Sequence, residues 1–91
     1  MSVPTVSFTR ALERFLPAPS TAVEGATVGA ALAAVFASRP ALRGYVLDDQ
    51  GALRRLVAVY VNGRLVSDRV RLSDPVGASD EIYVFQALSG G

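Results

Sequence analysis

The 91-residue sequence predicts one α+β domain in which a mixed sheet of four to five strands carries one main helix on one face. Three observations predict this architecture. A strongly patterned helix covers residues 28–38, a β-rich run breaks at Asn62-Gly63 and resumes, and an alternating strand covers residues 81–86. A single helix covers one face of such a sheet and leaves the other face open.

The N-terminal part predicts two strands joined by a long connection. Val3–Phe8 is rich in β-forming residues and indicates the first strand. Ala11–Leu16 has the composition of a helical turn, which two following prolines end. Thr21–Val23 then indicates a short second strand.

The segment after these two strands is the clearest helix in the chain. Thr27 is a suitable N-cap, alanine dominates the run, and Pro40 stops it. Apolar residues recur at helical spacing and form one stripe, made of Val28, Ala31, Leu32, Val35 and Phe36. The stripe predicts ordinary core packing against the sheet.

The middle of the chain has a weaker pattern. Ala41–Gln50 predicts an irregular or short helical segment, and it ends in a turn signal around Asp48 and Asp49. Paired acids can bind a cation, but the spacing of a calcium loop does not follow. We expect a solvated turn and no metal site.

The second half predicts a hairpin and a last strand. Leu53–Val61 is the strongest strand, and Asn62-Gly63 favours a tight turn because both residues tolerate positive φ. Five β-branched side chains share the parity that faces the helix, namely Val57, Val59, Val61, Ile82 and Val84.

The opposite parity predicts a docking surface. Leu56, Tyr60, Tyr83 and Phe85 fall on the uncovered face of the sheet. Large apolar side chains on an open sheet form a candidate patch for a protein partner. The alternative is that loops or the segment Ala11–Leu16 cover them.

Composition excludes several kinds of chemistry. The chain has no cysteine and no histidine, so it lacks a thiolate nucleophile and the usual general base and metal ligand. All nine cationic residues are arginine, and eight carboxylates nearly balance their charge. No basic run stands out, so we expect no nucleic-acid partner. No stretch approaches the roughly 20 apolar residues of a membrane span, and the start lacks the pattern of a signal peptide. We expect a cytoplasmic protein with no membrane partner.

The sequence ends in a short, small-residue arm. We divide the chain into a domain at 1–86 and a flexible tail at 87–91, which closes on Gly90-Gly91. Glycine has no Cβ, so such a tail can enter a channel too narrow for other residues. Frayed termini of small residues are common, so the Gly-Gly pair indicates a function only together with the sequence pattern before it.

The motifs together resemble a known family. The run Val61–Val66 is followed some 14 residues later by Asp80–Phe85 and then by the tail ending at Gly91. This order is similar to the ubiquitin-like β-grasp sulfur carriers, which include ThiS, MoaD and CysO, and it looks closest to the MoaD-like and CysO-like members. The resemblance spans nearly the whole chain and implies the β-grasp fold.

The resemblance also implies a chemistry on the last residue. In this family an E1-like adenylyltransferase and sulfurtransferase consumes ATP to adenylate the terminal glycine, and a sulfur donor then replaces AMP. Gly91 would carry the resulting thiocarboxylate, while Leu88, Ser89 and Gly90 would lie in the partner's channel. The chain would bind no cofactor itself and would be a cosubstrate, not an enzyme.

The sulfur acceptor and two rival functions stay open. The candidate acceptors are the large subunit of molybdopterin synthase, a PLP-dependent cysteine synthase and a thiazole synthase. The chain length and the extra mid-chain segment favour cysteine or molybdopterin. One rival is a ubiquitin-like protein modifier conjugated through Gly91. The other is a β-grasp binding module with no sulfur role.

Overall fold

The computed structural model describes residues 3–10 and 20–86. The predicted helical turn at Ala11–Leu16 lies outside these residues. The described elements, in chain order, are β1 (Thr5–Phe8), β2 (Ser20–Ala22), α2 (Val28–Ser38), α3 (Pro40–Val46), β3 (Val57–Val61), β4 (Arg64–Leu65) and β5 (Glu81–Gln86).

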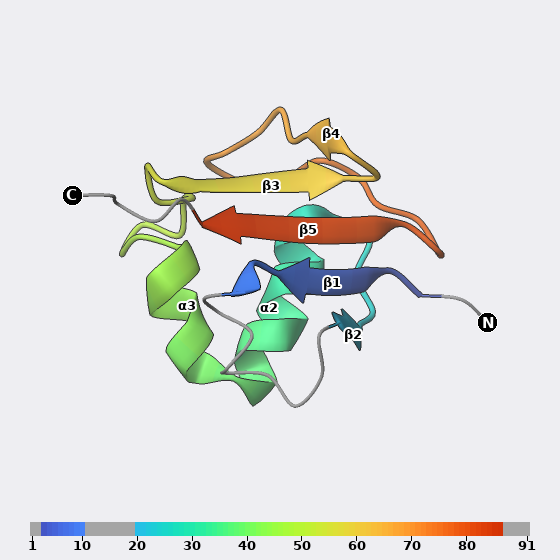
Figure 1. The fold of residues 1–91 in the computed structure, drawn as a ribbon, viewed down its shortest axis with the longest axis horizontal. Coiled ribbons are helices and arrows are strands. Elements are labelled where there is room, and N and C mark those ends of the chain that lie inside the picture. The colour runs from blue at the N-terminus through green and yellow to red at the C-terminus, as the bar shows by residue number, and fades with distance from the viewer. Residues whose placement is uncertain (1–2, 11–19, 87–91) are drawn as a thin grey trace.

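The five strands form one mixed sheet in the order β2-β1-β5-β3-β4. β5 lies at the centre, parallel to β1 and antiparallel to β3, while β2 and β4 pair antiparallel at the two edges. Figure 1 shows α2 crossing behind the sheet and α3 lying beside α2, below the C-terminal end of β5 in this view. The α+β architecture with a mixed sheet is confirmed.

Alternation along the strands builds the core, as predicted. Every second residue of β3 and β5 is buried, and these residues are the five predicted β-branched side chains. The predicted stripe of α2 is buried in full. Thr27 caps the helix, because its Oγ1 accepts the Ala30 amide at 3.1 Å.

Gly25 and Gly29 let the chain pass close to this helix. A Cβ on Gly25 would lie 2.6 Å from the Ala31 nitrogen, so no other residue fits without a shift. The Gly29 amide donates to the Leu72 carbonyl at 2.9 Å, which joins the first turn of α2 to the loop before β5.

One predicted segment is confirmed in part, and another begins later than predicted. Ala41–Gln50 was expected to be irregular or briefly helical, and its first part is the helix α3, since Pro40 begins it and Leu42 and Val46 are buried one turn apart. The strand predicted at Leu53–Val61 begins only at Val57. The preceding residues form a turn, in which the Val57 amide donates to the Arg54 carbonyl at 3.0 Å.

Candidate functional site

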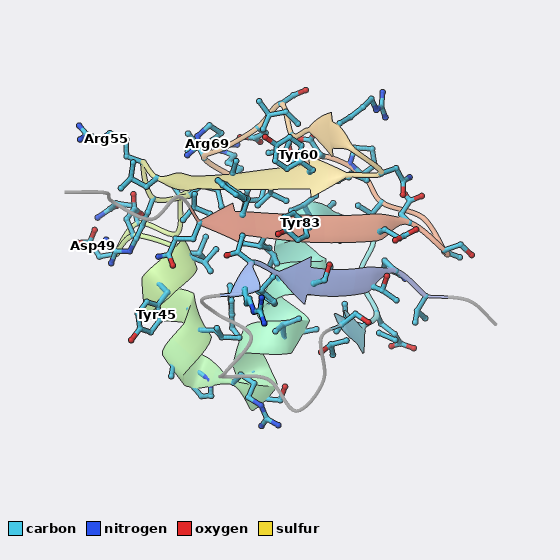
Figure 2. All side chains as sticks on the ribbon, viewed as in Figure 1. Tyr45, Asp49, Arg55, Tyr60, Arg69 and Tyr83 are labelled. Carbon is cyan, nitrogen blue, oxygen red and sulfur yellow. The ribbon has the colours of Figure 1, made fainter. Side chains whose placement is uncertain are left out.

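The predicted docking residues lie on the open face of the sheet. Tyr60 pairs with Tyr83 across β3 and β5, so their side chains lie side by side on this face (Figure 2). Phe85 pairs with Ala58 two residues further along the same two strands. The exposed fraction is 39% for Tyr83 and 43% for Phe85. The described residues therefore leave this face uncovered.

Leu65 extends the surface at the β4 edge, and Leu56 is exposed in the turn that leads into β3. Leu56 precedes β3 and is 46% exposed. Leu65 pairs with Tyr60 across β3 and β4 and is 57% exposed. Sequence reasoning missed Leu65, although a two-residue Asn-Gly turn places it opposite Tyr60. We call the five residues the open-face patch: Leu56, Tyr60, Leu65, Tyr83 and Phe85.

The patch leads to the root of the predicted tail. Val57 pairs with Gln86, so the start of β3 lies beside the end of β5. Gln86 is fixed by two bonds, because its amide donates to Thr9 Oγ1 and its Nε2 donates to the Tyr45 carbonyl, both at 3.3 Å. The predicted site residues Leu88, Ser89, Gly90 and Gly91 lie outside the described residues.

A side-chain clasp holds the opposite end of β3 and β5. Asn62 Nδ2 donates to Asp80 Oδ1 at 2.9 Å, and Asn62 Oδ1 accepts the Glu81 amide at 2.9 Å. Asn62 and Gly63 both have positive φ, 51° and 85°, which confirms the predicted turn. The Gly77 amide and then the Asn62 side chain hold the pKa of Asp80 below its ordinary value.

The loop between β4 and β5 folds around two aspartates. Asp68 accepts the Val70 and Arg71 amides and the Ser73 hydroxyl. The Ser73 hydroxyl is the largest cause that lowers the pKa of Asp68 to about 2. Asp74 accepts the amides of Ser67 and Asp68, both at 2.9 Å, and these bonds lower its pKa as well.

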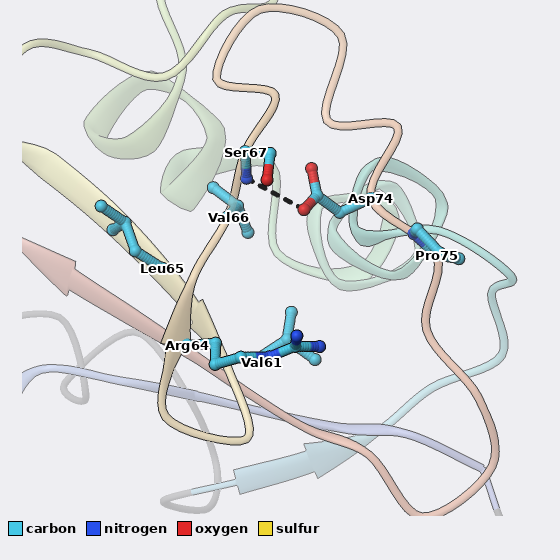
Figure 3. Close-up of a pocket in the computed structure, with 7 residues that line it drawn as sticks. All are labelled: Val61, Arg64, Leu65, Val66, Ser67, Asp74 and Pro75. Atoms are coloured by element: carbon cyan, nitrogen blue, oxygen red, sulfur yellow. Dashed lines mark hydrogen bonds between the residues drawn. The ribbon is translucent and has the colours of Figure 1, made fainter.

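A small hollow lies between β4 and this loop (Figure 3). Its volume is about 330 Å³, and Asp74 and Pro75 form one side of it. The carboxylate of Asp74 faces Ser67, whose amide it already binds. The Asp74 carboxylate therefore stabilises the loop through these hydrogen bonds.

Two further features of the described part of the chain concern metal ions and membranes. Across residues 3–10 and 20–86, no three potential acidic, histidine or cysteine ligands gather as a metal site would require. Over the same residues, no helix combines the length and the apolar content needed to cross a bilayer.

Comparison with known proteins identifies relatives of this chain. The model of the ThiS family matches residues 14–91. Small archaeal modifier protein 1 of Haloferax volcanii is 38% identical over 66 residues, which are 72% of this chain and 71% of the relative. This relative is by name a modifier protein, which agrees with the prediction of a carrier-type protein that is not an enzyme.

Solved structures show the same fold. The crystal structure of the Haloferax volcanii modifier has a TM-score of 0.82 at 30% identity and covers 97% of this chain and 98% of its own. A chain of the Amycolatopsis orientalis BexX/CysO complex has a TM-score of 0.85 at 26% identity, and the match covers 98% of this chain and 100% of that chain. CysO of Mycobacterium tuberculosis has a TM-score of 0.81 at 25% identity, and the match covers 93% of this chain and 99% of CysO. The chain is a ubiquitin-like β-grasp protein and belongs to the ThiS family.

Proposed function

We propose that this protein is a sulfur carrier that accepts sulfur on the carboxyl group of Gly91 and donates it in biosynthesis. The observation that carries the proposal is the position of the open-face patch, which runs along β5 directly to Gln86, where the Gly-Gly tail begins. A partner bound on the patch is thereby positioned to receive the tail. The similarity to ThiS-family and CysO chains supports this assignment.

The chemistry starts from a carboxylate, which is a poor acyl donor because oxide is a poor leaving group. An E1-like enzyme transfers AMP from ATP to the Gly91 carboxylate and releases pyrophosphate. Hydrosulfide displaces AMP at the acyl carbon, which breaks the acyl–phosphate bond and leaves a thiocarboxylate. If a persulfide of the partner attacks instead, it forms an acyl disulfide, and a second thiol then attacks the partner's sulfur, so that the thiocarboxylate leaves and the two thiols form a disulfide. The carrier has no cysteine, histidine or lysine, so the partners provide the catalytic groups. ATP is consumed by the activating enzyme, in the cytoplasm.

The tail and the patch have separate roles in this proposal. Gly90 and Gly91 let the backbone enter a narrow channel, and Ser89 follows the same path. Leu88 is the one large apolar residue of the tail and anchors it in the partner's channel. Tyr60 and Tyr83 lie at the centre of the docking patch, where aromatic side chains contribute most to affinity.

The second partner is a synthase that accepts the sulfur. The candidates are the large subunit of molybdopterin synthase, a PLP-dependent cysteine synthase and a thiazole synthase. A chain of this fold occurs in complex with BexX in Amycolatopsis orientalis, which supports docking of the fold on a second protein. We favour delivery to cysteine or molybdopterin synthesis.

A second candidate function is conjugation to proteins through Gly91. The 38% identity to a protein named small archaeal modifier protein 1 favours it. Both functions begin with the same adenylate, and they differ in whether sulfur or an amine displaces AMP. The chain has no lysine, so it cannot form lysine-linked polymers with its own copies.

One reconstitution separates these functions. The chain is incubated with the E1-like enzyme of its source organism, ATP and a sulfide source, with and without a lysate of the same organism. The carrier function predicts sulfur on the free chain and few conjugates in the lysate. Abundant conjugates without sulfur on the free chain would instead support the modifier. A variant lacking Gly90 and Gly91 should lose both reactions while retaining its circular dichroism spectrum, whereas a binding module would keep its partner.

A further inference from the structure

Two arginines flank the root of the tail. Arg55 lies in the turn before β3, and this turn is beside the end of β5 because Val57 pairs with Gln86. Arg10 lies on the other side of β5. It directly follows Thr9, whose amide donates to the Val84 carbonyl at 2.9 Å and whose Oγ1 accepts the Gln86 amide. Both arginines are exposed.

Neither guanidinium group is engaged by another residue that the structure describes. Arg10 and Arg55 make no hydrogen bond or ion pair among the interactions of the described residues. The neighbouring arginines behave differently. Arg69 Nη2 donates to the Arg54 carbonyl at 2.8 Å, and Arg54 Nε donates to the Gly44 carbonyl at 2.7 Å. These bonds fix the turn that carries Arg55 and leave its own charge free.

Among residues 3–10 and 20–86, no acidic side chain forms an ion pair with Arg10 or Arg55. Asp49 and Arg55 appear at the same end of the molecule (Figure 2), but no ion pair joins them. Asp48 Oδ1 accepts the Gln50 and Ala52 amides at 2.8 and 3.0 Å and is committed to its own turn. Within the described part of the chain, the tail root therefore presents unpaired positive charge on both sides of β5.

We propose that Arg10 and Arg55 form an arginine collar that pairs with carboxylates at the mouth of the activating enzyme's channel. The collar rests on the proposed function, since it requires a partner that receives the tail. The five residues from 87 to 91 reach roughly 16 Å when extended. The collar thus stands at the entrance, far from the nucleotide phosphates at the reacting carboxyl, and its complement is an acidic protein rim.

The collar acts mainly on encounter with the enzyme. Exposed charges at the rim of an interface change the association rate and its salt dependence more than the chemistry that follows. Reversing both charges replaces attraction by repulsion. We expect the KM for the carrier in adenylation to rise about 10-fold at low salt and the difference to shrink strongly when the Debye length falls to about 3 Å in 1 M salt. The kcat should not change.

A charge-matched control lies at the opposite side of the molecule. Arg64 follows the Asn62-Gly63 turn, and Arg71 lies in the loop that contacts the first turn of α2. Both are exposed. The R64E/R71E variant has the same net charge as R10E/R55E, so a collar effect predicts a raised KM only for R10E/R55E. An equal rise in both variants, or none in R10E/R55E, would overturn the collar.

A partner-free measurement keeps the two proposals distinguishable. A hexaglutamate peptide is titrated into the ¹⁵N-labelled protein, and we expect amide shifts around Arg10, Leu56 and Gln86 but not around Arg64. Shifts of equal size at Arg64, or none at millimolar peptide, contradict the collar. If no E1-like enzyme adenylates the wild-type chain, the proposed function fails, whereas this titration separately tests whether Arg10 and Arg55 bind carboxylates.

Discussion

The Asn62 clasp offers the sharpest test of how the fold holds its two central strands together. Replacing Asn62 by glycine removes the bonds to Asp80 Oδ1 and from the Glu81 amide, both 2.9 Å, but keeps the positive φ of 51° accessible. Replacing it by alanine removes the same bonds and also opposes this φ. The pair of variants therefore separates the side-chain bonds from the backbone conformation.

The expected magnitudes follow from these contacts. Each hydrogen bond contributes about 0.5–1.5 kcal/mol net, and the exposed partners regain water, so Asn62→Gly should lower the free energy of unfolding by about 1–2 kcal/mol. The left-handed conformation costs an L-residue other than Asn or Gly about 1 kcal/mol more, which gives about 2–3 kcal/mol for Asn62→Ala. At this chain length each kcal/mol lowers Tm by about 4–8 °C.

Urea unfolding followed by circular dichroism measures the free energy of unfolding of both variants. The same measurement on Asp80→Ala and on the Asn62→Gly/Asp80→Ala double variant completes a double-mutant cycle. The account predicts that Asp80→Ala costs less in the Asn62→Gly background than in the wild type, because the shared bond is already absent. Strict additivity of the two substitutions, or equal stability of the glycine and alanine variants, would refute the reasoning. Hydrogen exchange at the Glu81 amide should quicken in either Asn62 variant.

Further variants test the docking surface, the loop and the glycine contacts. Tyr83→Ala should weaken binding to the activating enzyme at least about 10-fold, measured by titration calorimetry, while lowering the free energy of unfolding by less than about 1 kcal/mol; unchanged affinity would remove Tyr83 from the interface. Asp68 has its pKa lowered from 3.8 to about 2, so its contribution to stability is complete above pH 3.8 and is lost as pH falls toward 2. The Asp68→Asn variant should therefore lose less stability than the wild type as the pH falls from 3.8 toward 2. The same pH dependence of stability in both proteins would contradict this role of Asp68. Gly25→Ala should cost about 2 kcal/mol or more through the 2.6 Å contact with the Ala31 nitrogen, whereas Gly44→Ala, with open space around it, should gain about 0.5–1 kcal/mol in thermal melts; equal effects would refute the contact.

Regular periodicity made most of the fold predictable. The stripe of α2 repeats at helical spacing and the valines of β3 alternate, so their burial follows from the sequence alone. The same alternation places Tyr60 and Tyr83 on the open face. The Asn62-Gly63 turn was equally visible, because positive φ is a local requirement.

Features that depend on long-range contacts were less accessible. α3 has only seven residues, and its helicity depends on burial of Leu42 and Val46. β3 begins late because residues before Val57 bond within a turn. The bond between Asn62 and Asp80 joins residues 18 positions apart, which only the register of β3 and β5 brings together.

Intact-mass spectrometry of the carrier tests the central claim most directly. The purified chain is incubated with the E1-like enzyme, ATP and a sulfide source, and its C-terminal peptide is then sequenced by fragmentation. Replacement of one oxygen by sulfur predicts a gain of about 16 Da located on Gly91, with no change in a chain lacking Gly90 and Gly91. An unmodified C-terminus after ATP has been consumed for adenylation, or the same mass gain in the truncated chain, would contradict the claim that Gly91 carries the sulfur.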